Sequence, residues 1–246
     1  NRRSGNAQKD AMLAGGRIHR KIQKRMGSGY RAEVPLKHEV MDDEQEIVLS
    51  VEGRADGIFT ENGITVIDEI KGMYTDVARL EAPIEVHLAQ AMCYGYFYCC
   101  DKDLDGSRLQ HTYCNLETEE IRRFQTDRSK EELEQWFSGV VHEYFKWARY
   151  LYHHELTRDA SIRNLEFPYP YREGQRDLVV SVYRTISRKK RLFIQAPTGI
   201  GKTLSTVFPA VRAIGEGKGD KLFYLTAKTV TRTVAEEALR ILRGKG

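Results

Sequence analysis

The sequence predicts an α/β protein built from two units, and three observations lead to that prediction. Apolar residues recur at helical spacing in several segments, and a strong hairpin signal, Asn62-Gly63, separates two strand-like runs. Farther along, a strand, a glycine-rich loop, a helix and another strand follow in order, which is typical of a parallel α/β unit. The segment 157–170 between these regions carries charge, asparagine and prolines. We therefore expect one domain over 1–160 and a second over 161–246.

The composition excludes several classes of protein. With 246 residues, 41% of them apolar, the chain is long enough for a sizeable core and too apolar to be disordered. No apolar run approaches the roughly 20 residues that span a bilayer, and no signal peptide follows Asn1. Four cysteines make no disulfide framework, so a cytoplasmic location is expected. A start at Asn1, without methionine, suggests a fragment.

The net charge of +4 hides a division between the two regions. Residues 161–246 hold 17 Lys and Arg against 7 Asp and Glu, a net charge of +10. Residues 1–160 hold 22 basic and 28 acidic residues, a net charge of −6. The asymmetry suggests two units with different tasks, and the basic unit is a candidate for binding polyanions.

The first region is expected to alternate helices and strands. Helices are predicted over 7–26, 84–100 and 129–155, and strands over 32–36, 46–60, 64–70 and 109–116. On the third helix, Trp136, Val140, Tyr144 and Trp147 form an apolar stripe. We interpret this stripe as core in preference to a base-stacking surface.

The predicted hairpin brings two carboxylates together. If Asn62-Gly63 is a two-residue turn, Glu61 faces Ile64 and Asp56 lies directly opposite Glu69, with Lys71 on the same face as Glu69. Facing like charges destabilise a sheet unless something neutralises them, and a divalent metal such as Mg²⁺ or Mn²⁺ would do so. The alternative is a solvated hairpin whose carboxylates pair with basic neighbours.

These residues resemble a known nuclease core. Gly53-Arg54-Ala55-Asp56 followed by Glu69-Ile70-Lys71 is similar to the PD-(D/E)xK core in its RecB-type form, with Ala55 in place of the proline. Upstream, Gly16 and His19 match the G-x-x-H element of that branch, and downstream, Gln90 and Tyr94 match its Q-x-x-x-Y element. The resemblance covers roughly residues 7–155.

The resemblance implies a mixed sheet flanked by helices and a metal-dependent DNA nuclease. His19, Asp56, Glu69 and the Ile70 carbonyl would bind Mg²⁺ or Mn²⁺, and Lys71 would assist the attacking water. Gln90 and Tyr94 would position the substrate or Lys71. Some members hold an iron–sulfur cluster, but the cysteines here lack the required spacing, so no cluster is expected. Three of them, Cys93, Cys99 and Cys100, are interpreted as core.

The second region contains a predicted phosphate-binding loop. Helices are expected over 175–187 and 203–214, strands over 192–195 and 222–226, and a final helix after them. The loop Ala196-Pro197-Thr198-Gly199-Ile200-Gly201-Lys202-Thr203 lies between a strand and a helix, where backbone N–H groups and the helix N-terminus would face phosphates. Lys202 would reach the β- and γ-phosphates, and Thr203 would bind Mg²⁺.

The loop and its flanks resemble superfamily-two helicases of the DinG/XPD type. The segment 167–175 is similar to their adenine-recognising element, which implies that Arg172 and Gln175 read the base, and Thr226 to Thr229 resembles their DNA-contacting motif Ia. The resemblance implies a RecB-type nuclease joined to an incomplete RecA-like domain, with ATP and DNA as partners and a role in DNA repair or processing. The nucleotide-binding residues would be Arg172, Gln175, Thr198, Gly199, Gly201, Lys202 and Thr203. With 86 residues after Ala160, the fragment is expected to bind nucleotide weakly without turning it over.

Two other functions remain open on the sequence. The first region is alternatively a catalytically silent DNA-docking domain, which its net charge of −6 favours, since phosphate binding usually needs basic residues. A small P-loop kinase is a weaker alternative, because no acidic motif follows the loop within the chain. The oligomeric state is unknown.

Overall fold

The computed structural model describes residues 2–42, 44, 47–197, 199–227 and 229–244, with side chains described from residue 13 onward except at 229–231. The chain divides into two compact units, 1–148 and 149–246, each described here by itself. The division falls inside a helix that runs from Lys130 to Arg163, and the predicted boundary at residue 160 stays a prediction. Within the described residues no helix is long and apolar enough to span a membrane.

The first unit is a five-stranded mixed sheet flanked by helices, so the predicted α/β class is confirmed. The strands lie in the order β1-β2-β3-β4-β5, antiparallel throughout except that β3 and β4 run parallel. Their bounds are Arg31–Asp42 (β1), Ile47–Glu61 (β2), Ile64–Met73 (β3), Gly106–Asn115 (β4) and Ile121–Ser129 (β5). The helices are α1 (Arg2–Arg25), the 3₁₀ turn η1 (Val77–Arg79), α2 (Glu85–Lys102) and the start of α3 (Lys130–Arg163).

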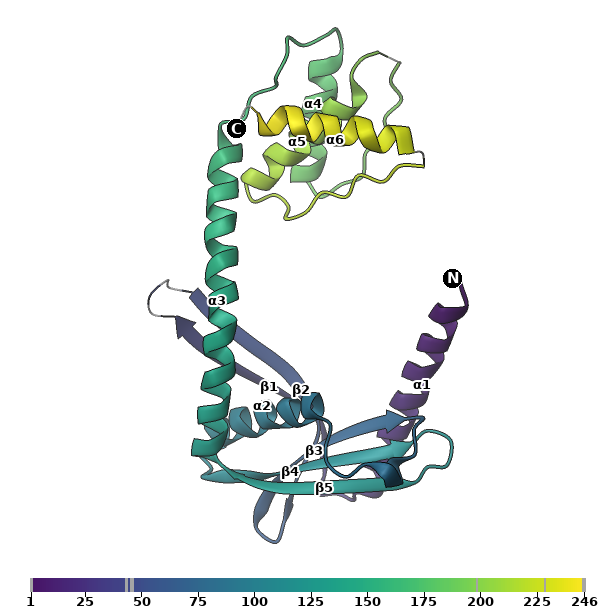
Figure 1. The fold of residues 1–246 in the computed structure, drawn as a ribbon, viewed down its shortest axis with the longest axis vertical. Coiled ribbons are helices and arrows are strands. Elements are labelled where there is room, and N and C mark those ends of the chain that lie inside the picture. The colour runs from purple at the N-terminus through teal and green to yellow at the C-terminus, as the bar shows by residue number, and fades with distance from the viewer. Residues whose placement is uncertain (1, 43, 45–46, 198, 228, 245–246) are drawn as a thin grey trace. The chain divides into compact units, whose positions relative to one another are not determined.

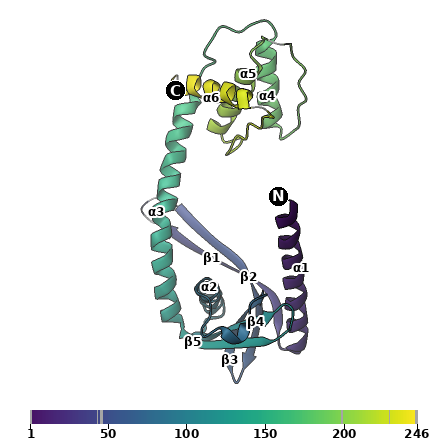
Figure 2. The same ribbon diagram turned by 45° about the vertical axis from the view of Figure 1, so that its right-hand side comes forward.

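Two helices bury opposite faces of this sheet. Helix α2 lies across one face (Figures 1 and 2), and its apolar side joins the largest core cluster together with residues of β2, β3, β4 and α3. The crossover between the parallel strands β3 and β4 contains α2, as a parallel pair requires. Helix α1 packs Ile18 and Ile22 on the other face, against Ile70 and Cys114. The predicted catalytic residues lie on the central strand β3, on its neighbour β2 and on α2.

The predicted core stripe on α3 is wrong at three of its four positions, and the fourth residue, Trp136, packs against the main core. Val140, Tyr144 and Trp147 are 48%, 52% and 66% exposed, and Trp136 is half-buried. The face that enters the core instead carries Leu133, Phe137, Val141 and Phe145. Both stripes repeat at helical spacing and are offset by one or a few residues, so apolar periodicity alone does not determine which one the sheet covers.

The predicted cysteine environment agrees with the structure in the first unit. Cys99 is buried in the main core, with Cys93 and Cys100 packed against it, and Cys114 is buried on the α1 side. Burial raises the pKa of the Cys93 thiol to about 11. The Cys93 thiol therefore stays protonated at neutral pH.

The second unit contains three helices connected by long irregular segments. They are α4 (Gln175–Ser187), α5 (Lys202–Gly215) and α6 (Thr229–Arg243), and the first two match the predicted ranges closely. The segments 192–195 and 222–226, predicted as strands, form no β-ladder among the described residues. Phe193 and Leu225 are 94% and 90% exposed there. Among the described residues these two segments pair neither with each other nor with the five-stranded sheet, so neither is a strand.

Candidate active site and phosphate-binding loop

The hairpin between β2 and β3 sets the geometry of the carboxylates. Asn62 and Gly63 both have positive φ, 51° and 80°, as a two-residue hairpin turn requires, and Glu61 pairs with Ile64. The register continues as predicted to Gly57 opposite Asp68, where the ladder ends. Asp56 and Glu69 are therefore not a ladder pair.

The Asp56 carboxylate contacts β3 in place of a ladder bond. Its Oδ2 accepts a hydrogen bond from the Ile70 N–H at 2.7 Å, while the Asp56 carbonyl accepts one from Gln23 Nε2 of α1 at 2.9 Å. His19, one turn earlier on α1, places Nδ1 3.3 Å from Asp56 Oδ1. The structure thus brings together His19 and Asp56 beside β3, as the motif resemblance implied.

Glu69 is the most buried member of the site. Its side chain is 1% exposed, and Lys71 Nζ forms an ion pair with its Oε1. The other oxygen, Oε2, is buried and has no hydrogen-bond partner among the described residues. Burial, and secondly the negative charge of Asp56, raise the pKa of Glu69 to about 7, against the opposing effect of Lys71.

The side chains of His19, Asp56 and Glu69 are of the types that bind a divalent cation. In this structure they instead make a hydrogen bond or ion pairs with protein groups. Two carboxylates converge, and an unsatisfied buried oxygen costs free energy that a cation would recover. Among the described residues no three His, Cys, Asp or Glu side chains stand together in ready metal-binding geometry. The two carboxylates have protein partners instead, because Asp56 accepts a hydrogen bond from the Ile70 N–H and Glu69 forms an ion pair with Lys71.

Gln90 and Tyr94 support the strand that carries Asp56. Gln90 Nε2 donates to the Tyr94 hydroxyl at 3.1 Å, and that hydroxyl accepts from the Arg54 N–H at 3.3 Å. A Cβ at Gly53 would lie 2.5 Å from the same hydroxyl, so glycine is required for this close approach. In this structure the pair contacts the β2 backbone rather than Lys71.

Strand β4 adds polar residues to the site that no sequence motif indicated. His111 pairs in register with Glu69, and Tyr113 with Lys71, so they lie on the same face of the sheet. The Tyr113 hydroxyl accepts from the Ile84 N–H at 2.9 Å and lies 3.1 Å from His87 Nδ1. Burial lowers the pKa of both histidines, and the positive charge of Lys71 lowers each further. The sequence signal that could have indicated these residues is the presence of polar side chains within the buried strand β4.

The phosphate-binding loop begins α5 in the second unit. Gly199 and Gly201 have positive φ, 87° and 79°, and Lys202 and Thr203 start the helix, while Thr198 lies outside the described residues. Lys202 Nζ donates to the carbonyls of Ala196 and Pro197 at 3.0 and 2.9 Å. The lysine ammonium thus lies inside the loop, where a phosphate would compete for it.

Arg172 and Gln175 reach this loop from the segment before α4. Arg172 Nη1 donates to the Gly199 carbonyl, and Gln175 Nε2 donates to the Ile200 carbonyl at 2.9 Å. A Cβ at Gly201 would lie 2.6 Å from Gln175 Nε2, so the glycine permits the contact. Every described residue predicted to bind nucleotide is therefore gathered at the N-terminus of α5.

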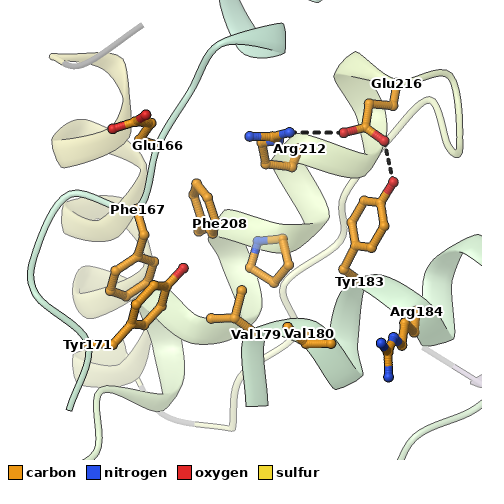
Figure 3. A pocket seen from close by; sticks show the side chains of 11 residues that line it. Glu166, Phe167, Tyr171, Val179, Val180, Tyr183, Arg184, Phe208, Arg212 and Glu216 are labelled. Carbon is orange, nitrogen blue, oxygen red and sulfur yellow. Dashed lines mark hydrogen bonds and ion pairs between the residues drawn. The ribbon is translucent and has the colours of Figure 1, made fainter. Parts of the chain in front are cut away.

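A separate pocket of about 630 Å³ lies along α4 and α5 (Figure 3). Phe167 and Tyr171 stack on one side with ring centroids 4.5 Å apart. On the other side Glu216 accepts from Tyr183 and pairs with Arg212. The residues that line this pocket include neither Arg172, Gln175 nor Lys202, so it is distinct from the phosphate-binding loop.

Comparisons with known proteins give limited matches. No family model matches the chain. A protein of Methanocaldococcus jannaschii named as a probable ATP-dependent helicase is 45% identical over 47 residues, which are 19% of this chain and 7% of that protein. The crystal structure of SSO0001 aligns with 53% of this chain and 59% of its own, with a TM-score of 0.39 and 16% identity, a likeness too small to carry an argument.

Proposed function

We propose that the first unit is a metal-dependent DNA nuclease. The observations that carry the proposal are the contact of His19 with Asp56 beside β3, and the burial of Glu69, whose Oε2 has no hydrogen-bond partner among the described residues and whose Oε1 contacts Lys71. A Mg²⁺ or Mn²⁺ ion held by these groups and the Ile70 carbonyl would polarise a phosphodiester and supply hydroxide at neutral pH.

The residues of the chain then have separate roles. Glu69 and Asp56 provide the negative charge that holds the cation, and a pKa near 7 for Glu69 means that it loses its proton as the cation binds. Lys71, released from Glu69, would orient the attacking water or stabilise charge on the phosphate. Gln90 and Tyr94 would be positioning residues. They fix the β2 backbone near Asp56, because Gln90 donates to the Tyr94 hydroxyl and that hydroxyl accepts from the Arg54 N–H.

Cleavage of end-labelled single-stranded and flapped DNA in Mn²⁺ tests this proposal. The full chain should cleave, and Asp56→Ala and Lys71→Ala should each reduce the rate by at least about 100-fold. Glu52→Gln, which alters an exposed carboxylate on β2, is the matched control and should cleave at the normal rate. An Asp56→Ala protein as fast as the unaltered chain would overturn the proposal.

The second unit is proposed to bind ATP as part of a DNA helicase. The phosphate-binding loop, with Lys202 at the start of α5 and Arg172 and Gln175 against it, supports this role. The short match to a protein named as a helicase agrees with it. Lys202→Ala should weaken binding of a fluorescent ATP analogue at least about tenfold, whereas Lys218→Ala, which alters an exposed lysine beyond α5, should leave binding unchanged.

A silent DNA-docking domain is the second candidate for the first unit. The existing bonds of Asp56 and Glu69 to protein donors favour it, because they leave the carboxylates partly neutralised without a metal. Calorimetry separates the two functions. No heat of Mn²⁺ binding to the full chain would favour docking, and Mn²⁺ binding that Glu69→Gln removes would favour the nuclease.

A further inference from the structure

The outward face of α1 carries a row of cations beside the candidate nuclease site. Arg17, Arg20 and Lys24 are exposed and recur at spacings of three and four residues, so they lie along one side of the helix. Among the described residues none of the three has an ion-pair partner, in contrast to Lys21 of the same helix, which pairs with Glu119. We call Arg17, Arg20 and Lys24 the α1 cation row.

The orientation of α1 fixes where this row lies. Ile18 and Ile22 are buried on the sheet, and His19 and Gln23, one residue farther round the helix, reach Asp56. Successive residues turn by about 100°, so positions 20 and 24 lie one further step round, away from the sheet, and position 17 lies about 100° from Ile18 on the opposite side from His19. The cation row therefore lies on the side of α1 that points away from Ile18 and Ile22 and is open to solvent, with Arg20 and Lys24 next in rotation to His19 and Gln23.

Charge complementarity identifies the ligand of this row as a polyanion. The region 1–160 has a net charge of −6, and the carboxylates of the site add local negative charge, so a phosphate chain needs unpaired cations nearby to bind. From Arg17 to Lys24 the helix rises about 10 Å, which is about three nucleotides of a B-form strand. The dimension fits a short run of backbone phosphates.

We infer that the α1 cation row binds the phosphate backbone of the DNA strand presented to the site of His19, Asp56 and Glu69. The inference rests on the proposed nuclease function for the identity of the polyanion. Its contacts are with phosphates alone, so the row confers affinity and strand direction without sequence preference. Arg17, Arg20 and Lys24 are binding residues, and chemistry at saturating DNA does not depend on them.

Fluorescence anisotropy with a labelled single strand of about 20 nucleotides tests the inference, in EDTA so that no cleavage occurs. The variant R17Q/R20Q/K24Q is compared with K21Q/K37Q/K102Q, which removes three cations that are paired with Glu119, Glu39 and Asp101. If each cation of the row contacts one phosphate, the slope of log K against log salt becomes flatter by about 2. Affinity at 0.1 M salt then falls about 100-fold. The control should change by less than about threefold.

The outcomes separate this inference from the proposed function. Lost affinity in the row variant, with no cleavage by the unaltered chain in Mn²⁺, keeps the row as a DNA-binding surface and rejects the nuclease. If the unaltered chain cleaves DNA and the row variant binds DNA with the same affinity and salt slope as the unaltered chain, the inference that the α1 cation row binds DNA is wrong. A third outcome is that the row variant loses binding to polyglutamate, which the unaltered chain and the control retain, while its DNA binding is unchanged. That result would assign the row to an acidic protein and overturn the inference. Circular dichroism must show that both variants are folded.

Discussion

Replacing Glu69 by Gln should stabilise the first unit while removing its metal site. The pKa of Glu69 is raised from 4.5 to about 7, chiefly because the side chain is buried and secondly because Asp56 is near. The folded state therefore holds a proton that the unfolded state releases, and the free energy of unfolding falls as the pH rises from about 4.5 to about 7. A rise of that size corresponds to roughly 3 kcal/mol, fully lost above pH 7. Because Gln is neutral at every pH, the Glu69→Gln variant should not lose this free energy of unfolding.

Urea unfolding followed by tryptophan fluorescence measures this effect in the full chain. Both tryptophans, Trp136 and Trp147, lie in the first unit, so the signal reports on that unit. At pH 5 the two proteins should have similar stability, and at pH 8 Glu69→Gln should be more stable by up to about 3 kcal/mol. Glu52→Gln, an exposed control, should match the unaltered chain at both values. A Glu69→Gln protein that is no more stable at pH 8 would refute the reasoning.

Three further predictions test other parts of the structure. Gly53→Ala should destabilise the first unit by about 1–3 kcal/mol in urea unfolding, since its Cβ would lie 2.5 Å from the Tyr94 hydroxyl; unchanged stability would contradict that contact. Phe137→Ala should cost about 3–5 kcal/mol and Trp147→Ala less than about 1, measured by Trp136 fluorescence, and equal costs would restore the predicted core stripe. Lys202→Ala should weaken binding of an ATP analogue at least tenfold in a fluorescence titration, because the loop loses its cation, and unchanged affinity would place the nucleotide elsewhere.

The hairpin was predictable because a turn fixes its register. Two residues with positive φ, Asn62 and Gly63, determine every pair up to Gly57 and Asp68, and the sequence alone identifies such a turn. The next pair, Asp56 opposite Glu69, was predicted but does not form. The ladder ends before it, and the Asp56 carboxylate instead accepts a hydrogen bond from the backbone of β3. The carboxylates still approach one another, which is why the predicted site retains its members.

The pairing of β3 with β4 was not predictable in the same way. These strands are parallel and joined through α2, so no turn determines which residue of β4 faces Glu69. His111 and Tyr113 therefore became visible only in the structure. For α3, two apolar stripes compete, and the sheet covers the one that contains Phe137. Long-range packing decides both cases.

The nuclease function of the first unit is measured by cleavage of end-labelled single-stranded DNA in Mn²⁺, with the full chain compared to its Asp56→Asn variant. Asn keeps the size of the side chain and removes the charge that would hold the cation. The unaltered chain should cleave, and Asp56→Asn should cleave at a rate at least about 100-fold lower. No cleavage by the unaltered chain under these conditions, or equal cleavage by both proteins, would contradict that function.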